Sequence, residues 1–177
     1  MYVEGKARIK YSDNAFLNPT AKFVRDLCVA FAGSIASKET SILDPTAATG
    51  IRGIRYYLET RSKDVTLLDI NKKAAAIAKK NLAFNKVKAR LLNKSIQEFA
   101  NTTDERFDII DLDPFGSIAP NLYDILKISK DGTYLTFSAT DAAVLCGAHP
   151  KACLKIYAAA AAIVNVTEVM QRFESPL

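Results

Sequence analysis

The stretch that decides the fold is Ser41-Ile42-Leu43-Asp44-Pro45-Thr46-Ala47-Ala48-Thr49-Gly50. In it, a short apolar strand is followed by a turn of small residues that leads into a helix. The strand is predicted over Ser41 to Asp44 and the helix over Gly50 to Glu59. Small side chains in such a turn let the backbone approach a ligand, and the amino terminus of the helix offers free N–H groups. The stretch therefore predicts a ligand site at the end of a strand. A sharp turn with a purely structural role is the alternative.

Strands and helices alternate on both sides of this turn. In chain order we predict a helix over 21–37, after Asn18-Pro19-Thr20, then a strand over 65–69, a helix over 72–84, strands over 89–92 and 107–112, a helix over 122–128 and, after the Asp131-Gly132 turn, a strand over 133–138. This alternation predicts parallel β-α-β units. We therefore expect an α/β fold with a doubly wound, mainly parallel sheet and helices on both faces.

The last twenty residues carry a mixed signal. Ala158 to Ala162 is an alanine run, which favours a helix, whereas residues 163–169 alternate as a strand would. No linker rich in Gly, Ser or Pro and no internal repeat interrupts the 177 residues, of which 49% are hydrophobic and 24% charged. We therefore expect the chain to fold as one globular unit.

Composition and charge narrow the classes of function. No apolar stretch reaches the ~20 residues needed to cross a bilayer, and the amino end lacks the apolar core of a secretory signal, so a cytoplasmic protein without a membrane partner is expected. A net charge of +5 favours a polyanionic partner. The basic residues closest together in sequence are Lys72, Lys73, Lys79, Lys80, Lys86, Lys88, Arg90 and Lys94. This cluster predicts either a surface that faces phosphates or a solvated helix face that keeps the protein soluble.

The three cysteines are an odd number without the spacing of a disulfide framework, which suits a reducing compartment. Cys146, His149 and Cys153 lie close enough in sequence to suggest metal ligands. A structural zinc site normally has four protein ligands, however, and no obvious fourth lies nearby. We interpret the thiols as buried or unreactive and expect no metal.

An acidic residue, Asp69, closes the second strand about twenty residues after the first turn, where its carboxylate can accept hydrogen bonds from ribose hydroxyls. This pairing indicates an adenosine cofactor. A dinucleotide-binding turn would show G-x-G-x-x-G, but only Gly50 and Gly53 occur here, and no Gly-Lys-Ser/Thr of a P-loop follows the strand. S-adenosylmethionine has the ribose without the pyrophosphate and fits best.

A second candidate for a functional site is Asp111-Leu112-Asp113-Pro114-Phe115-Gly116, at the end of another apolar run. Ligands of open α/β sheets bind at this carboxyl edge of the strands. Asp113 and the Pro114 carbonyl can accept hydrogen bonds from an NH2 group, and Phe115 can stack on the ring that carries it. Gly116 leaves room for close approach. The set suits methyl transfer to an exocyclic amine, although a turn that merely ends the strand is the alternative.

Taken in order, these stretches resemble the tRNA guanine-26 N2,N2-dimethyltransferase family, a class I group that depends on S-adenosylmethionine. The resemblance covers Glu4 to Tyr157. It is carried by Glu4-Gly5-Lys6-Ala7, Asn18-Pro19, Arg25-Asp26, Ala48 to Arg55, Asp69-Ile70-Asn71, Asp111 to Ser117, Ala139-Thr140-Asp141 and Leu145 to Leu154.

The resemblance implies a Rossmann-like enzyme that methylates N2 of guanine 26 in tRNA, once or twice. It implies Asp113, Pro114 and Phe115 as catalytic residues, and Asp113, Phe115 and Gly116 as the residues that bind the guanine. The cofactor-binding candidates are Arg25, Asp44, Gly50, Arg52, Asp69 and Ser95. Without the family match, Arg25 is expected to be a charge on a helix surface and Arg52 a solvated residue of a first helical turn.

The chain departs from the family pattern in two places. Asn93-Lys94-Ser95-Ile96 stands where the family has an acidic residue followed by alanine, with Ser95 in the acidic place, so a reduced affinity for the cofactor is expected. Family members also continue past Tyr157 with further strands and a carboxyl-terminal domain that helps hold tRNA, which this chain lacks in recognisable form. We expect residues 1–40 to pack as an amino-terminal extension and helix on a methyltransferase domain of residues 41–177. A separate domain or partner is then expected to help hold the tRNA.

Three other functions stay open. The first is methylation of adenine N6 or of a protein glutamine, whose usual motif is Asn/Asp-Pro-Pro-aromatic, from which Pro114-Phe115 departs. The second is a module that binds the cofactor or tRNA without turnover. The third is a nicotinamide-dependent dehydrogenase.

Overall fold

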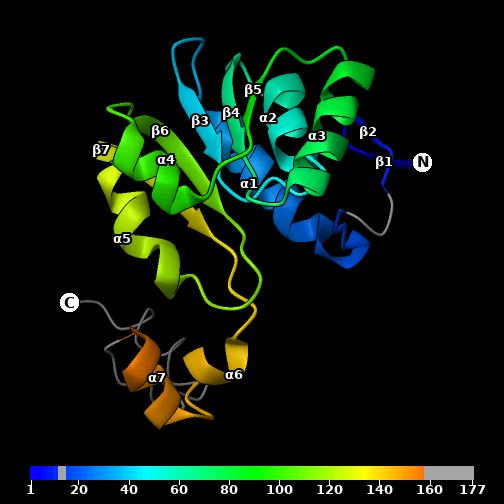
Figure 1. The fold of residues 1–177 in the computed structure, drawn as a ribbon. Helices are drawn as coiled ribbons and strands as arrows, with labels where there is room; N and C mark the ends of the chain where they lie inside the picture. The colour runs from blue at the N-terminus through cyan, green and yellow to red at the C-terminus, as the bar shows by residue number, and fades with distance from the viewer. Residues whose placement is uncertain (12–14, 158–177) are drawn as a thin grey trace, which may run out of the picture.

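A computed structural model describes residues 1–11 and 15–157, so the helix and strand expected over 158–169 lie outside the described residues. Its centre is a five-stranded sheet with the order β5-β4-β3-β6-β7, in which every pair is parallel (Figure 1). The strands are β3 (Ser41–Asp44), β4 (Asp64–Leu68), β5 (Arg90–Leu92), β6 (Phe107–Leu112) and β7 (Ser129–Phe137). The predicted α/β fold with a doubly wound parallel sheet is confirmed.

Helices cover both faces of the sheet (Figure 1). They are α1 (Lys22–Ile35), α2 (Ile51–Glu59), α3 (Lys72–Phe84), α4 (Ile96–Thr102) and α5 (Ala119–Lys127), with the short α6 (Ala142–Leu145) and α7 (Pro150–Tyr157) beyond the carboxyl edge of the strands. Helices α1, α2 and α3 share one core with Ile42 and Ile109, while α4 and α5 share the other with Leu43 and Ile110. Two cores form because successive strand residues point to opposite faces. None of these helices, in the part of the chain that is described, is both long and apolar enough to span a bilayer.

The strand order positions the site. The chain runs outward from β3 through β4 to β5, then returns to β6 on the other side of β3 and continues to β7. The order therefore reverses between β3 and β6, and the loops that leave the carboxyl ends of these two strands diverge to opposite faces. Open α/β sheets bind ligands in the crevice at such a switch point.

A two-stranded hairpin, β1 (Tyr2–Glu4) and β2 (Ala7–Ile9), was not expected from the sequence, because three residues per strand are too few to show a period. It packs on the same core as α1 and α2. The buried Glu4 carboxylate accepts hydrogen bonds from Arg25 Nη2 at 2.6 Å and from Arg55 Nη1 at 2.7 Å. We propose on this basis that residues 1–40 and the sheet fold as one unit.

Two predicted boundaries are corrected by the structure. Helix α5 begins at Ala119, three residues before the predicted start, with a proline in its first turn. Strand β7 begins at Ser129, so Asp131-Gly132 does not precede the strand as a turn. It lies inside the strand, where the register with β6 shifts after Phe107. Four residues of β7, 130–133, stand opposite one residue of β6 there, so the pairing is interrupted, and Gly132 has a φ angle of 82°, which favours glycine. Local sequence patterns do not distinguish such an interruption from a turn that precedes the strand.

Gly53 lets α2 approach the sheet. A Cβ added at this position would lie 2.6 Å from Leu67 Cδ2, closer than packed atoms tolerate. We expect Gly53→Ala to lower the free energy of unfolding by about 1–3 kcal/mol through overpacking, measured by urea denaturation. Gly33→Ala in α1 is the control, because nothing lies within 4 Å of the added Cβ. That variant should be stabilised by up to about 1 kcal/mol through helix propensity. Equal stabilisation of both variants would contradict the close packing.

Candidate active site

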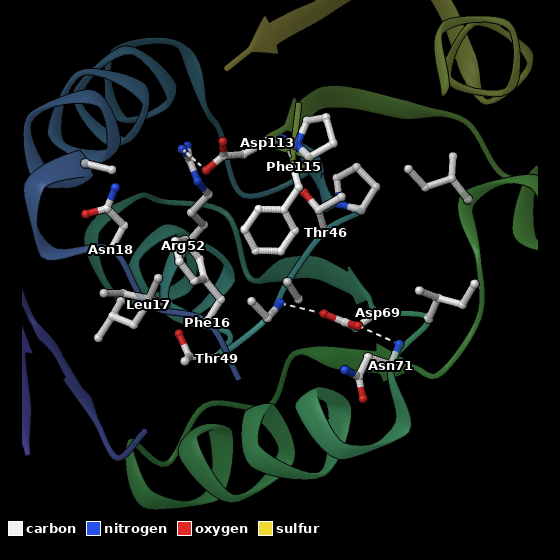
Figure 2. A pocket seen from close by; sticks show the side chains of 18 of the residues that line it. Phe16, Leu17, Asn18, Thr46, Thr49, Arg52, Asp69, Asn71, Asp113 and Phe115 are labelled. Carbon is white, nitrogen blue, oxygen red and sulfur yellow. Dashed lines mark hydrogen bonds and ion pairs between the residues drawn. The ribbon is translucent and has the colours of Figure 1, made fainter. Parts of the chain in front are cut away.

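A cavity of about 570 Å³ opens at the carboxyl edge of the sheet, at the switch point (Figure 2). The loops after β3, β4, β5 and β6 contribute to its wall, together with the segment that leads into α1. Among the predicted site residues, those that line it are Arg25, Arg52, Asp69, Ser95, Asp113, Pro114 and Phe115. Figure 2 shows Arg52 and Asp113 on the opposite side of the cavity from Asp69 and Asn71. The cavity thus has an Asp69 side and an Asp113 side.

The loop after β3 brings backbone against the cavity. Ala48 and Gly50 have positive φ angles of 46° and 81°, and Gly50 ends the loop as the amino-terminal cap of α2. The strained Ala48 is held by the hydrogen bond from its N–H to Asp69 Oδ2, at 2.7 Å. Gly50 does not line the cavity. The fully buried Thr49 hydroxyl lines the cavity and has no hydrogen-bond partner among the described residues.

Asp69 is fixed by its neighbours. Its Oδ2 accepts from the Ala48 N–H and its Oδ1 from the Asn71 N–H, each at 2.7 Å. A carboxylate oxygen has two acceptor positions, so both oxygens keep one for a hydroxyl in the cavity. The carboxylate is therefore held in one orientation at the cavity, and binding to ribose hydroxyls stays a prediction.

Asp44 lies under the loop, away from the cavity wall. It is fully buried, and its Oδ2 accepts from the Gly53 N–H at 3.2 Å. Burial, with the charge of Asp111 as the second cause, raises the pKa of Asp44 to about 7. Asp44 thus ties the loop to α2, and direct contact with a cofactor stays a prediction.

The raised pKa of Asp44 makes stability depend on pH. The unfolded carboxyl titrates near pH 3.9, so between about pH 4 and 7 the folded protein holds a proton that the unfolded chain releases. The stabilisation is complete below this window and is lost as the pH rises through it. As the pH rises from 4 to 7, we expect the free energy of unfolding of the wild type to fall by a few kcal/mol relative to that of Asp44→Asn, at about 1.4 kcal/mol per pH unit. Urea denaturation of both proteins at several pH values measures this difference. If the difference in unfolding free energy between the two proteins does not change with pH, the raised pKa of Asp44 is wrong.

Arg52 joins two carboxylates at the Asp113 side. Its Nη1 donates to Asp111 Oδ2 at 2.6 Å and its Nη2 to Asp113 Oδ2 at 2.7 Å. Burial lowers the pKa of Arg52, but the charges of Asp111, Asp113 and Asp44 outweigh it and raise the pKa above its ordinary value. Arg52 is 4% exposed, so the expectation of a solvated first-turn residue is wrong. The guanidinium offsets one of the two carboxylate charges and leaves the other facing the cavity through Asp113.

Asp111 is saturated by partners and stays in the core. Besides Arg52, the Tyr56 hydroxyl donates to Oδ2 at 2.5 Å and the Thr136 hydroxyl donates to Oδ1 at 2.8 Å. Burial and the charge of Asp111 raise the pKa of Tyr56 well above its ordinary value, so this phenol remains a donor. Asp111 therefore orients Arg52, and Arg52 orients Asp113.

The loop after β6 is braced at both ends. The Asp113 N–H donates to Thr46 Oγ1 at 3.2 Å, which ties this loop to the loop after β3. Gly116 has a φ angle of 78°, which favours glycine, and its N–H donates to Thr140 Oγ1 at 2.8 Å. Gly116 does not line the cavity, but its conformation lets the chain turn so that Phe115 projects outward.

Phe115 is 77% exposed at the cavity and meets Phe16 edge to face, with ring centroids 4.8 Å apart and an interplanar angle of 71°. Phe16 is itself 56% exposed. The exposed face of Phe115 leaves room for a flat ring beside this pair. Phe16 was missed by the sequence reasoning, because nothing local marks an aromatic residue before a helix as part of a distant site.

Arg25 also differs from the surface charge expected without the family match. It is 4% exposed, and its Nε and Nη2 bind the Glu4 carboxylate at 2.8 and 2.6 Å. Its Nη1 donates to the Asn18 carbonyl at 3.0 Å. Arg25 thus fixes the segment that carries Phe16 against the amino-terminal hairpin, and binding to a cofactor stays a prediction.

Ser95 stands at the Asp69 side of the cavity. Its hydroxyl accepts from the Glu98 N–H at 3.0 Å and caps α4. The preceding Asn93 Nδ2 donates to the Asp69 carbonyl at 2.7 Å. The segment that departs from the family pattern is therefore anchored to the strand that carries Asp69.

The residues considered as metal ligands have different surroundings. Cys153 is buried, whereas Cys146 and His149 are exposed. Within residues 1–11 and 15–157 no group of three or more His, Cys, Asp or Glu side chains is arranged to hold a metal ion.

Comparison with known proteins adds a family match. Residues 1–171 match the model of the N2,N2-dimethylguanosine tRNA methyltransferase family. The tRNA (guanine(26)-N(2))-dimethyltransferase of Pyrococcus horikoshii is 37% identical over an alignment of 179 positions, which covers 88% of this chain and 46% of that protein. The enzyme of the same name from Pyrobaculum arsenaticum is 36% identical over 150 residues, which cover 84% of this chain and 42% of that protein.

Solved structures agree with this match. Trm1 from Pyrococcus horikoshii, in a complex with S-adenosyl-L-methionine, superposes with a TM-score of 0.83 and 34% identity over 91% of this chain and 48% of that chain. The ribosomal protein L11 methylase from Lactobacillus delbrueckii subsp. bulgaricus, with a TM-score of 0.60 and 19% identity, shows the same fold. The chain spans less than half the length of the relatives from Pyrococcus horikoshii and Pyrobaculum arsenaticum.

Proposed function

Because the chain belongs to the N2,N2-dimethylguanosine tRNA methyltransferase family, we propose that it transfers methyl groups from S-adenosylmethionine to N2 of guanine 26 in tRNA, giving N2-methylguanine and N2,N2-dimethylguanine. The observation that carries the proposal is the pairing inside one cavity of a fixed ribose acceptor, Asp69, with a carboxylate that Arg52 aims inward, Asp113. A tRNA substrate also agrees with the cytoplasmic location expected from the sequence.

The Asp69 side of the cavity fits S-adenosylmethionine. The volume of about 570 Å³ lies within the range of small-molecule sites. Asp69 would hold the ribose hydroxyls, and the unpaired Thr49 hydroxyl offers a hydrogen bond to the polar end of the ligand. When bound, this cofactor supplies an electrophilic methyl group on a sulfonium. Binding through Arg25, Asp44, Gly50, Arg52 and Ser95 belongs to the same proposal, with Asp44 and Gly50 acting through the shape of the loop.

The Asp113 side supplies the polar groups for the amine. Asp113 Oδ2 is engaged by Arg52, while in the described part of the chain Oδ1 takes no hydrogen bond. Oδ1 and the Pro114 carbonyl can accept the two N–H bonds of guanine N2. These bonds favour a more pyramidal nitrogen, whose lone pair is less delocalised into the ring, and they stabilise the positive charge that develops on it during transfer. Asp113 or water then takes the released proton.

Phe115 and Phe16 provide a surface for the base. Guanine 26 lies inside folded tRNA, so it has to leave its stack at a cost of a few kcal/mol. Stacking on the exposed Phe115 ring would offset about 1–3 kcal/mol of this cost. Gly116 contributes by the turn that projects Phe115.

The test is transfer of radiolabelled methyl from S-adenosylmethionine to unmodified tRNA. We expect the label in N2-methylated guanine with guanine at position 26, and none in the same tRNA with adenine there. Label in adenine N6 or in protein glutamine would move the chain to another class of amine methyltransferase. If calorimetry shows binding of S-adenosylmethionine but no methyl group is transferred to any tRNA, the chain is a binding module without turnover.

A further inference from the structure

The excess of positive over negative charge comes from one stretch of the chain. Residues 70–97 contain eight basic residues and no acidic residue, whereas the rest of the chain holds 16 basic and 19 acidic residues. The net charge of +5 therefore comes entirely from this stretch. It consists of α3, β5, their flanking loops and the first residues of α4 (Figure 1). Arg90 and Lys94 form ion pairs with Glu105 and Glu98, so the lysines of α3 carry most of the unpaired charge.

Four lysines form two lines along the outer face of α3. The pairs Lys72/Lys79 and Lys73/Lys80 are each seven residues apart, which is two helical turns or about 10 Å. All four side chains are exposed, and none forms an ion pair with any described residue. A helix face that serves only solubility usually mixes both signs of charge. A face with one sign, and no partner for it, instead suits a polyanion.

Aromatic side chains border these lysines. Beside α3 lies a small hollow of about 150 Å³, lined by Lys10, Tyr11, Ile77, Lys80 and Asn81. Tyr11 is 51% exposed, and Lys10 Nζ lies 4.5 Å from the centroid of the half-exposed Phe84 ring. Lysines interleaved with exposed aromatic rings suit a nucleic acid better than an acidic protein, because rings can stack on bases while lysines hold phosphates.

The lysine face is joined to the cavity. Buried Asn81 exchanges two hydrogen bonds with the backbone of Lys10, each at 2.9 Å, and its Nδ2 also donates to the Thr49 carbonyl at 2.9 Å. Thr49 lines the cavity. One buried amide thus links the wall of the hollow to the loop after β3, which lines the cavity.

We propose that Lys72, Lys73, Lys79 and Lys80 of α3, together with Lys10, form a phosphate-binding surface that holds the tRNA backbone while a base occupies the cavity. The proposal rests on the proposed function and adds the place where the substrate is gripped. We refer to these five residues as the α3 basic surface.

The test compares two double variants with the same change of charge. Lys73→Gln/Lys80→Gln removes two lysines of the α3 basic surface, and Lys6→Gln/Lys38→Gln removes two exposed lysines elsewhere, also without an ion pair in the described residues. Binding of fluorescently labelled tRNA is measured by anisotropy from 50 to 200 mM salt. We expect Lys73→Gln/Lys80→Gln to bind tRNA at least about tenfold more weakly, and the slope of log affinity against log salt concentration to be smaller by about two. The control should bind tRNA as the wild type does. The affinity of both variants for S-adenosylmethionine, measured by calorimetry, should also stay at the wild-type value.

Each outcome separates this proposal from the proposed function. Four results would overturn the α3 basic surface. Both variants could bind tRNA as tightly as the wild type, or both could lose affinity equally. The wild type could bind no tRNA, or it could prefer anionic lipid vesicles to tRNA. If these variants methylate guanine 26 with wild-type kcat and KM, the proposed function stands without this surface. If only Lys73→Gln/Lys80→Gln loses tRNA binding but the wild type transfers no methyl group, the surface stands and the proposed function fails.

Discussion

Asp113→Ala is expected to reduce kcat for methyl transfer to tRNA by about 10²–10⁴-fold, because it removes the acceptor that meets the amine in the transition state. Affinity for S-adenosylmethionine should stay close to the wild-type value, since Asp113 lies on the side of the cavity opposite Asp69. Single-turnover transfer of radiolabelled methyl, together with calorimetry of cofactor binding, separates the two effects.

Asp113→Asn provides a sharper version of the same prediction. Arg52 Nη2 requires an acceptor at 2.7 Å, so the amide oxygen should turn toward Arg52 and the NH2 group toward the cavity. A donor in that place cannot accept a hydrogen bond from the substrate amine. We therefore expect Asp113→Asn to lose nearly as much activity as Asp113→Ala, whereas Asp131→Asn on an exposed part of β7 should keep full activity. An active Asp113→Asn enzyme would show that the negative charge and this orientation are not needed.

Arg52→Met is expected to have the largest effect on stability. It leaves the buried Asp111 carboxylate with only the Tyr56 and Thr136 hydroxyls, and loss of one partner of a buried ion pair typically costs about 3–5 kcal/mol. The free energy of unfolding from urea denaturation at pH 7 measures this loss. Activity should fall as well, by about the same factor as in Asp113→Ala, because Asp113 is then no longer oriented.

A double variant distinguishes an unpaired charge from a simple packing defect. Arg52→Met/Asp111→Asn removes the orphaned charge and should recover much of the lost stability but none of the activity. Lys22→Met, which breaks the exposed Lys22–Asp26 ion pair, is the control and should leave stability almost unchanged. A double variant as unstable as Arg52→Met would mean that the charge of Asp111 is not the cause.

The predicted secondary structure is accurate where local periods and turn chemistry are strong. Strands β3 and β6 have the predicted ends, and α3 spans the predicted Lys72 to Phe84. Errors fall where tertiary contacts compete with local patterns. The Asp131-Gly132 pair lies in an interruption of the pairing between β6 and β7, which resumes at Tyr134, and the short β1 and β2 pack on the core that α1 and α2 share. Such elements depend on partners that sequence periods do not reveal.

The sequence by itself determined the five strands of the sheet, helices α1, α2, α3 and α5, and the turn of small residues after β3, but not α4, α6, α7 or the β1–β2 hairpin. It also placed Asp69 and Asp113 at strand ends. These follow from side-chain period and turn preference, which act over a few residues. Only the tertiary structure decided that Arg52 binds Asp111 and Asp113, that Arg25 is buried against Glu4, and that Phe16 meets Phe115. Arg52 and Asp111 are 59 positions apart in the chain, and they meet because the strand order reverses between β3 and β6. The polar groups are then buried together, and a buried charge persists only where a partner lies within hydrogen-bond distance.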